Sequence, residues 1–203
     1  MDKTTDLQLP ADATEIKDYE FEDNLDLVSI VIPTGITRIG EGAFSGCFSL
    51  RSVFIPDTVT EISARAFHSC LALSSINLPP GLTEIADELF SGCTQLSTLT
   101  LPSRVSKIGD RAFLSCDGLT GLVLPEALTE IGEKAFSDCM RLSRLAIPDA
   151  VETIGDQAFG ECPGLNKALL PPRFKDRESD IFGPDDIDLL GDDIDLDNLF
   201  SDD

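Results

Sequence analysis

Apolar side chains recur along this chain at a fixed step of 23 residues. Within one step, Val53 and Ile55 lie two positions apart and so share one face of an extended segment. Pro56 ends that segment because proline has no backbone N–H to donate. Val59 and Ile62 then supply a second inward-facing pair. Each step therefore predicts one short strand, a turn at proline and a second short extended segment.

The remainder of each step is a small or acidic pair, such as Gly132-Glu133, followed by Ala-Phe-x-x-Cys. This pattern predicts one helical turn with its acid near the N-terminal end, where the helix dipole favours negative charge. The aromatic residues of this segment are Phe44, Phe67, Phe90, Phe113, Phe136 and Phe159.

A repeat this short cannot bury its own apolar face, so successive units must stack and bury those faces against each other. We therefore expect a repeat solenoid with parallel β-strands, one per coil, and short extended or helical turns elsewhere. Residues 1–26 fit a degenerate N-terminal capping repeat, since Ile16 and Phe21 keep core positions while Asn24 replaces cysteine. Residues 27–174 form the solenoid, which we expect to end where Arg177 replaces the equivalent of Ile154.

Cysteine also follows the 23-residue step, at Cys47, Cys70, Cys93, Cys116, Cys139 and Cys162. Equivalent side chains in successive coils point the same way, so they lack the facing geometry of a disulfide. Zinc sites use closely spaced Cys or His pairs, and His68 is the single histidine. The pattern predicts six structural core thiols and neither a metal site nor any other cofactor.

These positions together read L-x-x-[IVL]-x-[IL]-P-x-x-[VIL]-T-x-I-G-x-x-A-F-x-x-C. The pattern resembles the BspA-like (treponemal-type) leucine-rich repeat family over residues of about 5–174, with Leu119–Cys139 a close match and departures at Ser63 and Ala86. The resemblance implies a leucine-rich-repeat solenoid used for adhesion and protein–protein contact, without naming a ligand.

Residues 175–203 have a different composition, with eleven Asp and one Glu against Lys175 and Arg177, a net charge of −10. Self-repulsion of this density predicts a disordered acidic tail. Apolar residues alternate with the acids, as in acidic activation segments and other partner-binding segments. The tail motif comprises Ile181, Phe182, Ile187, Leu189, Leu190, Ile194, Leu196, Leu199 and Phe200.

Three roles for this tail remain open: a partner-binding segment, a passive solubilising segment, or an intramolecular latch. The latch would cover a basic patch, because the outward strand positions become basic only at Arg144 and Lys167. The other outward positions mix apolar and small polar residues, which suits either a contact face or ordinary strand propensity. The candidate partner-binding face comprises Val31, Phe54, Asn77, Thr100, Val123, Arg144, Ala146, Lys167 and Leu169.

The net charge of −22 disfavours direct binding of nucleic acid, because phosphate would be repelled. We find no apolar run long enough for a signal peptide or a membrane span, so we expect no membrane insertion and a cytoplasmic or nuclear location. No nucleophile, phosphate-loop or dinucleotide motif occurs, which argues against an enzyme. The sequence predicts a non-catalytic protein-interaction scaffold; the alternatives are a transcriptional co-regulator acting through its tail and a surface or adhesion protein.

Overall fold

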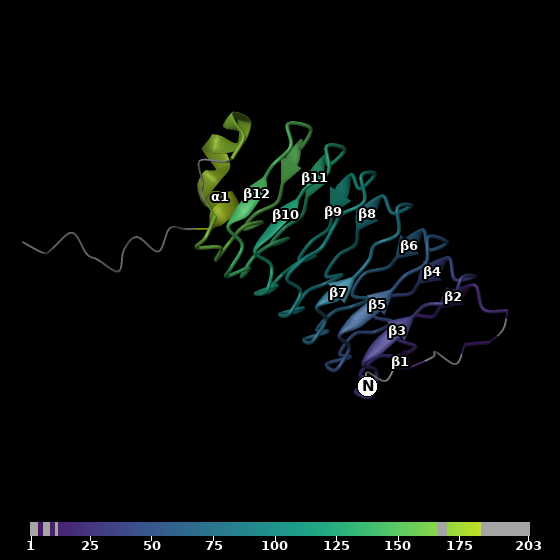
Figure 1. Ribbon diagram of the computed structural model, residues 1–203. Coiled ribbons are helices and arrows are strands. Elements are labelled where there is room, and N and C mark those ends of the chain that lie inside the picture. The colour runs from purple at the N-terminus through teal and green to yellow at the C-terminus, as the bar shows by residue number, and fades with distance from the viewer. Residues whose placement is uncertain (1–3, 6–8, 11, 166–169, 184–203) are drawn as a thin grey trace, which may run out of the picture.

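The computed structural model describes residues 4–5, 9–10, 12–165 and 170–183 of the chain. They form a stack of coils in which each coil lies on the one 23 residues before it (Figure 1). This confirms the predicted repeat solenoid. Three sides can be distinguished around each coil, and each side is built by a different part of the repeat.

The first side carries short parallel strands that pair with a register of 23 residues, for example Val31 with Phe54. Their order is β1-β3-β5-β7, followed by the separate pair β10-β12. We call the outward surface of this column the strand face. Its members are β1 (Thr4–Thr5), β3 (Ser29–Val31), β5 (Ser52–Phe54), β7 (Ser75–Ile76), β10 (Gly121–Val123) and β12 (Arg144–Ala146).

The second side, where the sequence predicted an extended segment, is a further column of two-residue parallel strands. Each strand buries its second residue, as Ile39 and Ile131 illustrate, and exposes or half-exposes its first. We call this the second-strand side. It consists of β2 (Glu15–Ile16), β4 (Arg38–Ile39), β6 (Glu61–Ile62), β8 (Glu84–Ile85), β9 (Lys107–Ile108), β11 (Glu130–Ile131) and β13 (Thr153–Ile154).

The third side consists of turns, so the predicted helical turn in each coil is wrong. Two residues per coil have left-handed backbone, such as Arg65 at φ 59° and Ser69 at φ 55°. This geometry lets N–H groups alternate between partners: Phe44 N–H donates to Ala66 O in the next coil at 2.8 Å, whereas Cys47 N–H donates to Phe44 O in its own coil at 3.2 Å. The bonds to the next coil form a continuous turn-side ladder.

The core is a column of phenylalanine rings running along the stack. Neighbouring rings from Phe21 to Phe159 are stacked at centroid separations of 5.1 to 5.9 Å, and those from Phe44 to Phe159 are almost completely buried. Each ring therefore buries its two faces against the coils before and after it, as the repeat predicted.

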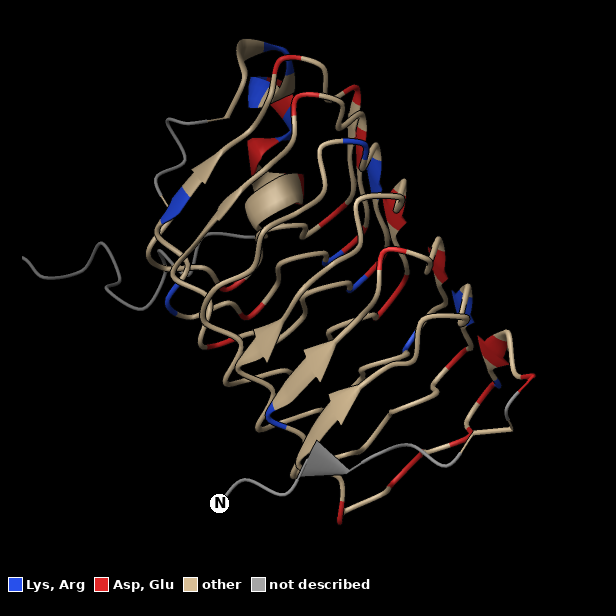
Figure 2. Cartoon of the chain, turned by 45° about the vertical axis from the view of Figure 1, so that its right-hand side comes forward, with Lys and Arg blue, Asp and Glu red and all other residues tan. Residues whose placement is uncertain are grey.

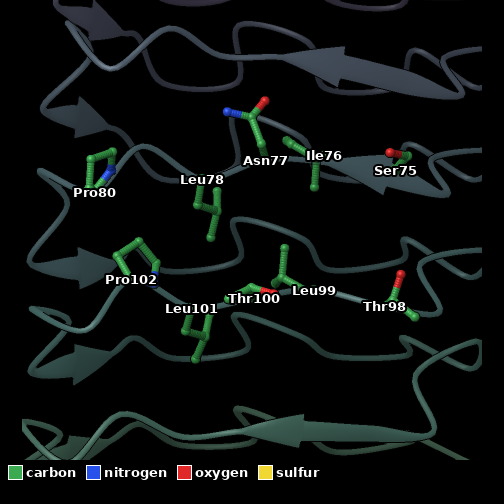
Figure 3. A pocket seen from close by; sticks show the side chains of 10 residues that line it. All are labelled: Ser75, Ile76, Asn77, Leu78, Pro80, Thr98, Leu99, Thr100, Leu101 and Pro102. Carbon is green, nitrogen blue, oxygen red and sulfur yellow. The ribbon is translucent and has the colours of Figure 1, made fainter.

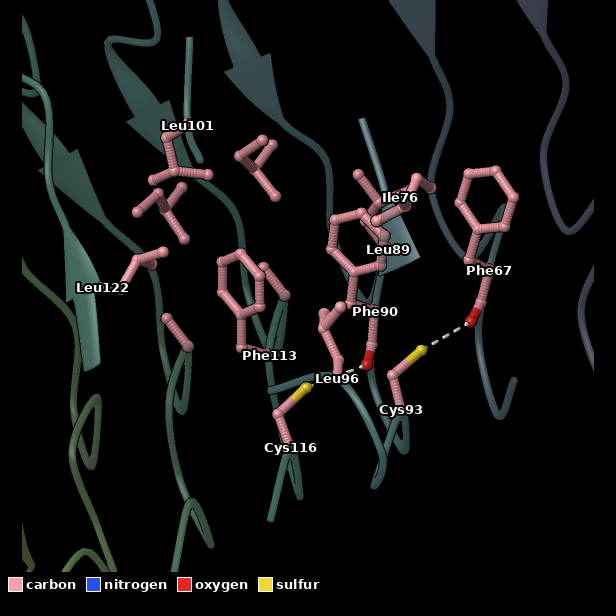
Figure 4. Packing of buried hydrophobic residues seen from close by; sticks show 14 of the residues in the cluster. Phe67, Ile76, Leu89, Phe90, Cys93, Leu96, Leu101, Phe113, Cys116 and Leu122 are labelled. Carbon is pink, nitrogen blue, oxygen red and sulfur yellow. Dashed lines mark hydrogen bonds between the residues drawn. The ribbon is translucent and has the colours of Figure 1, made fainter. Parts of the chain in front are cut away.

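The six cysteines are free and buried, which confirms the predicted core thiols. Each Sγ also donates a hydrogen bond that the sequence did not reveal, to the carbonyl of the phenylalanine 26 residues earlier (Figure 4). Cys93 reaches Phe67 O at 3.2 Å and Cys162 reaches Phe136 O at 3.0 Å. A thiol is small and apolar yet a weak donor, so it satisfies a buried carbonyl without a strongly polar side chain.

The C-terminal end corrects the predicted boundary of the acidic tail, because residues 175–183 are ordered against the last coil. The 3₁₀-helix η2 (Pro172–Arg177) leads into α1 (Glu178–Phe182). Ile181 is fully buried, and the ring centroids of Phe182 and Phe159 are 5.7 Å apart. These two residues therefore belong to the fold and not to an exposed motif. Residues 184–203 lie outside the described part of the chain.

The helix α1 also completes the turn-side ladder, since Asp180 O and Ile181 O accept from Gln157 N and Phe159 N at 2.6 and 3.0 Å. Arg177 donates to Ile154 O at 2.8 Å and pairs with Asp156. Phe182 is one step of 23 beyond Phe159, a signal that the prediction overlooked. These residues therefore act as the C-terminal cap.

Two truncations test this cap. A chain ending at Gly183 should keep the melting temperature of the full chain, because it retains every contact that α1 makes with the described coils. A chain ending at Arg177 loses the buried Ile181 side chain, a loss of roughly 1.5–3 kcal/mol, so its melting temperature should fall by about 5–10 °C in differential scanning calorimetry. Equal melting temperatures for the two truncated chains would contradict the capping role.

Thiol reactivity tests the cysteine column. Burial raises the pKa of Cys47 to about 11 and that of Cys116 to about 12, so both thiols stay protonated and unreactive near neutral pH. We expect none of the six thiols to react with a disulfide reagent at pH 8 until the chain is unfolded, when all six react. Because the folded state holds the Cys47 and Cys116 protons more tightly than the unfolded chain does, the free energy of unfolding should decline as pH rises above about 8.5. Rapid reaction of the folded protein would contradict this account.

Candidate protein-interaction face

The strand face exposes large apolar side chains because the residues on either side of each point into the core. Val31, Phe54 and Val123 expose 51%, 55% and 86% of their surface, while Ile30, Val53 and Leu122 behind the same strands are buried. Arg144, Ala146 and Thr100 are exposed as well. Six members of the predicted face are therefore available to a partner.

Charge is distributed unevenly between the sides. The strand-face segments of six successive coils contain no Asp or Glu, although the chain has 37 of them, and their charged residues are Arg51 and Arg144 (Figure 2). The segments are 28–32, 51–55, 74–78, 97–101, 120–124 and 143–147. The strand face is thus an acid-free surface on a strongly acidic protein.

Asn77 is half-buried on the strand face, and its side-chain amide is also used within the fold. Its Oδ1 accepts from Ile55 N at 2.9 Å and its Nδ2 donates to Ile55 O at 2.7 Å. Beyond the end of β7, the side-chain amide thereby forms the two hydrogen bonds with Ile55 that a neighbouring strand backbone would otherwise form. Lys167 and Leu169 lie outside the described residues, as do the seven tail-motif residues beyond Phe182.

A shallow hollow of about 390 Å³ opens on the strand face between residues 75–80 and 98–102 (Figure 3). Leu78 and Leu99 contribute apolar surface to it, and Ser75, Thr98 and Thr100 contribute hydroxyls. No charged side chain lines it. Its open shape and its mixture of apolar and hydroxyl groups fit a surface contact.

A second exposed apolar column was missed by the sequence reasoning. Leu25, Phe48 and Leu71 expose 56%, 47% and 42% of their surface at the position that follows the cysteine, and Met140 occupies the same position further along. The signal was present, because these residues also keep the 23-residue step.

The second-strand side differs from the strand face because it is solvated and charged. Arg38 contacts Glu15, Asp18 and Glu61 at 3.0 to 3.3 Å, and Lys107 contacts Glu130 at 3.2 Å. The Glu41 N–H and the Arg38 guanidinium hold the pKa of the Asp18 carboxyl below its usual value. Solvent screens exposed pairs of this kind, so they add little to stability.

Within the described residues, no three potential metal-ligand side chains lie together. No helix of the described chain is both long enough and apolar enough to span a membrane. These findings concern only the part of the chain that the structure describes.

Comparison with solved structures identifies bacterial proteins of the same architecture. The leucine-rich repeat protein of T. pallidum is 32% identical, with a TM-score of 0.73 and coverage of 77% of this chain and 73% of its own. A leucine-rich repeat protein of Bacteroides ovatus is 35% identical, with a TM-score of 0.66, and a leucine-rich cell surface protein of Faecalibacterium prausnitzii is 30% identical, with a TM-score of 0.55.

This chain aligns with 70% and 75% of its length to the Bacteroides and Faecalibacterium proteins but spans only 39% and 57% of theirs. No curated protein matches it. The family described as BspA type leucine rich repeat region matches residues 14–142 and 85–187, in six copies. Since these matches cover most of the chain and the coils have the treponemal architecture, the protein belongs to the BspA-type leucine-rich repeat family.

Proposed function

We propose that this protein is a non-catalytic scaffold that binds another protein through its strand face. The observation that carries the proposal is the coincidence of exposed Phe54 and Val123 with an absence of acidic residues on one side of a chain of net charge −22. Interface centres are depleted in charge and enriched in aromatic residues, and an exposed apolar surface costs solubility unless it is covered in use.

The face also indicates the kind of partner. Its N-terminal half presents Val31 and Phe54, and its C-terminal half presents Arg144 beside Val123. A partner that fits both halves would carry an apolar cluster for the first and a carboxylate for the second. The Arg144 guanidinium would then contribute to the orientation of the partner and to the association rate more than to the affinity.

Substitutions that preserve strand propensity test this proposal. Phe54→Thr and Val123→Thr remove the exposed apolar surface, and each should weaken binding to a captured partner by about tenfold, as expected for an interface anchor. The measurement is isothermal titration with the purified partner. Thr60→Ala, an exposed change on the second-strand side, is the matched control and should leave the affinity unchanged.

If both strand-face variants bind as tightly as the unchanged chain, the contact lies elsewhere and the proposal fails. An equal loss of affinity in Thr60→Ala would also contradict it, because binding would then not depend specifically on the strand face.

The tail is a second candidate for partner binding, supported by the alternation of acidic and apolar residues over 184–203. It would make the protein a transcriptional co-regulator if the partner belongs to the transcription machinery. Fusing these residues to a DNA-binding domain tests this role, since a silent reporter would exclude it.

A surface or adhesion role is the third candidate, and it draws support from a relative that is described as a cell surface protein. The proposal of a cytoplasmic or nuclear location competes with it. Locating the tagged full-length chain separates the two, because an adhesion role requires the protein outside the cell.

A further inference from the structure

The hydrogen bonds between coils are interrupted at one place on the second-strand side. Elsewhere along this side, the residue at the glycine position donates to an isoleucine carbonyl one coil earlier, as Gly109 N does to Ile85 O and Gly132 N to Ile108 O, both at 2.8 Å. Within the described chain, the corresponding bond from Ala86 N to Ile62 O is missing, and β6 does not pair with β8.

The bond before the strand is missing as well. Ser106 N donates to Thr83 O and Thr60 N to Thr37 O, at 2.8 and 2.9 Å, but no such bond joins Thr83 to Thr60 in the described structure. The second-strand column is therefore divided into β2-β4-β6 and β13-β11-β9-β8.

The strand face is also interrupted here, over two coil contacts, because residues 98–101 pair neither with β7 before them nor with β10 after them. The column β1-β3-β5-β7 ends at Ile76, and residues 98–101 of the next coil form no strand. A cut through the chain at Pro80 therefore separates two blocks, 12–79 and 81–165, that face each other without main-chain pairing on two of three sides. The hollow lined by residues 75–80 and 98–102 lies on the strand face over this unpaired contact.

The turn side remains continuous across this cut. Arg65, Phe67 and Ser69 donate to Asp87, Leu89 and Ser91 at 3.0, 3.1 and 2.7 Å. Arg65 also forms two hydrogen bonds with the Glu88 carboxylate, at 2.8 and 3.0 Å. Phe67 and Phe90 still stack across the cut, although their separation of 5.9 Å is the widest among the stacked rings.

Three departures from the repeat account for the break, and all three lie beside it. First, Ala86 replaces the glycine that allows close approach of the coils: a Cβ built at Gly132 would lie 2.6 Å from Asp110 N. Ser63 occupies the same position with its bond intact, so a Cβ alone does not break the ladder.

Second, Ala64 occupies a position where Asp18, Asp87 and Asp110 each accept a backbone N–H from the next coil, as Asp87 Oδ1 does from Asp110 N at 2.9 Å. Third, charge alternation fails. Arg38 lies between Glu15 and Glu61, and Lys107 lies between Glu84 and Glu130, so two glutamates meet at the cut. Like charges at facing strand positions repel.

We propose that the solenoid hinges at this cut. The blocks rock about the turn-side ladder from Arg65 to Ser91, and the second-strand side and the strand face open and close. Because Phe54 and Val123 lie on opposite blocks, the hinge changes their separation and allows the strand face to adjust to a partner. Such motion draws on regions where the fewest hydrogen bonds must break.

Paired spin labels measure this motion directly. Labels at Thr60→Cys and Thr129→Cys span the cut, and labels at Thr83→Cys and Glu152→Cys span the same 69 residues within the C-terminal block. All four positions are exposed, whereas the native thiols are buried. The distance distribution across the cut should be about twofold wider than that of the control pair. Equal widths would overturn the proposal.

Repair of the cut supplies an independent test. The double change Ala64→Asp and Ala86→Gly restores the repeat, and it should narrow the distribution across the cut to that of the control pair. Ser63→Gly places a glycine at the equivalent position of a coil contact whose hydrogen bond is intact. It should therefore leave the distribution of distances across the cut wide. Circular dichroism establishes that each variant is folded. A repaired chain with an unchanged distribution, or equal narrowing by Ser63→Gly, would contradict the hinge.

Discussion

Each coil of this protein buries its apolar side chains against other coils, and everything else in the structure depends on that constraint. A 23-residue coil encloses too little volume to hold a core, so Phe113 is buried because Phe90 and Phe136 stack on its two faces at 5.6 and 5.1 Å. Stacking at this distance requires each coil to follow the path of its neighbour. The repeat therefore determines where each coil lies relative to its neighbours as well as which side chains are buried.

The same requirement explains the chemistry of the other columns. Close approach favours glycine at the corner before the turn, and the buried phenylalanine carbonyls receive cysteine S–H donors. Residues that face solvent are released from these demands, and on the strand face they include Phe54 and Val123 and no acids. The strand face and the break near Pro80 are the places where the repeat does not dictate the residue, so their side chains are free to serve binding and motion.

Sequence reasoning predicted the solenoid, the strand face and the core thiols because identical side chains at identical spacing leave few arrangements. It failed where backbone geometry decides the outcome. The Ala-Phe-x-x-Cys segment looked helical, but left-handed residues such as Arg65 redirect its N–H groups to the next coil. It also placed the tail boundary too early, because the acidic composition around Phe182 concealed a phenylalanine in step with the core.

The measurement that tests the central claim most directly is the free energy of unfolding of Phe113→Ala, compared with that of Val123→Ala. Phe113 is fully buried between two coils, whereas Val123 is the most exposed large apolar residue on the strand face. The account predicts a loss of about 3–5 kcal/mol for Phe113→Ala and less than about 1 kcal/mol for Val123→Ala in denaturant unfolding. Similar small losses in both variants would show that stability does not come from burial between coils, and would contradict the account.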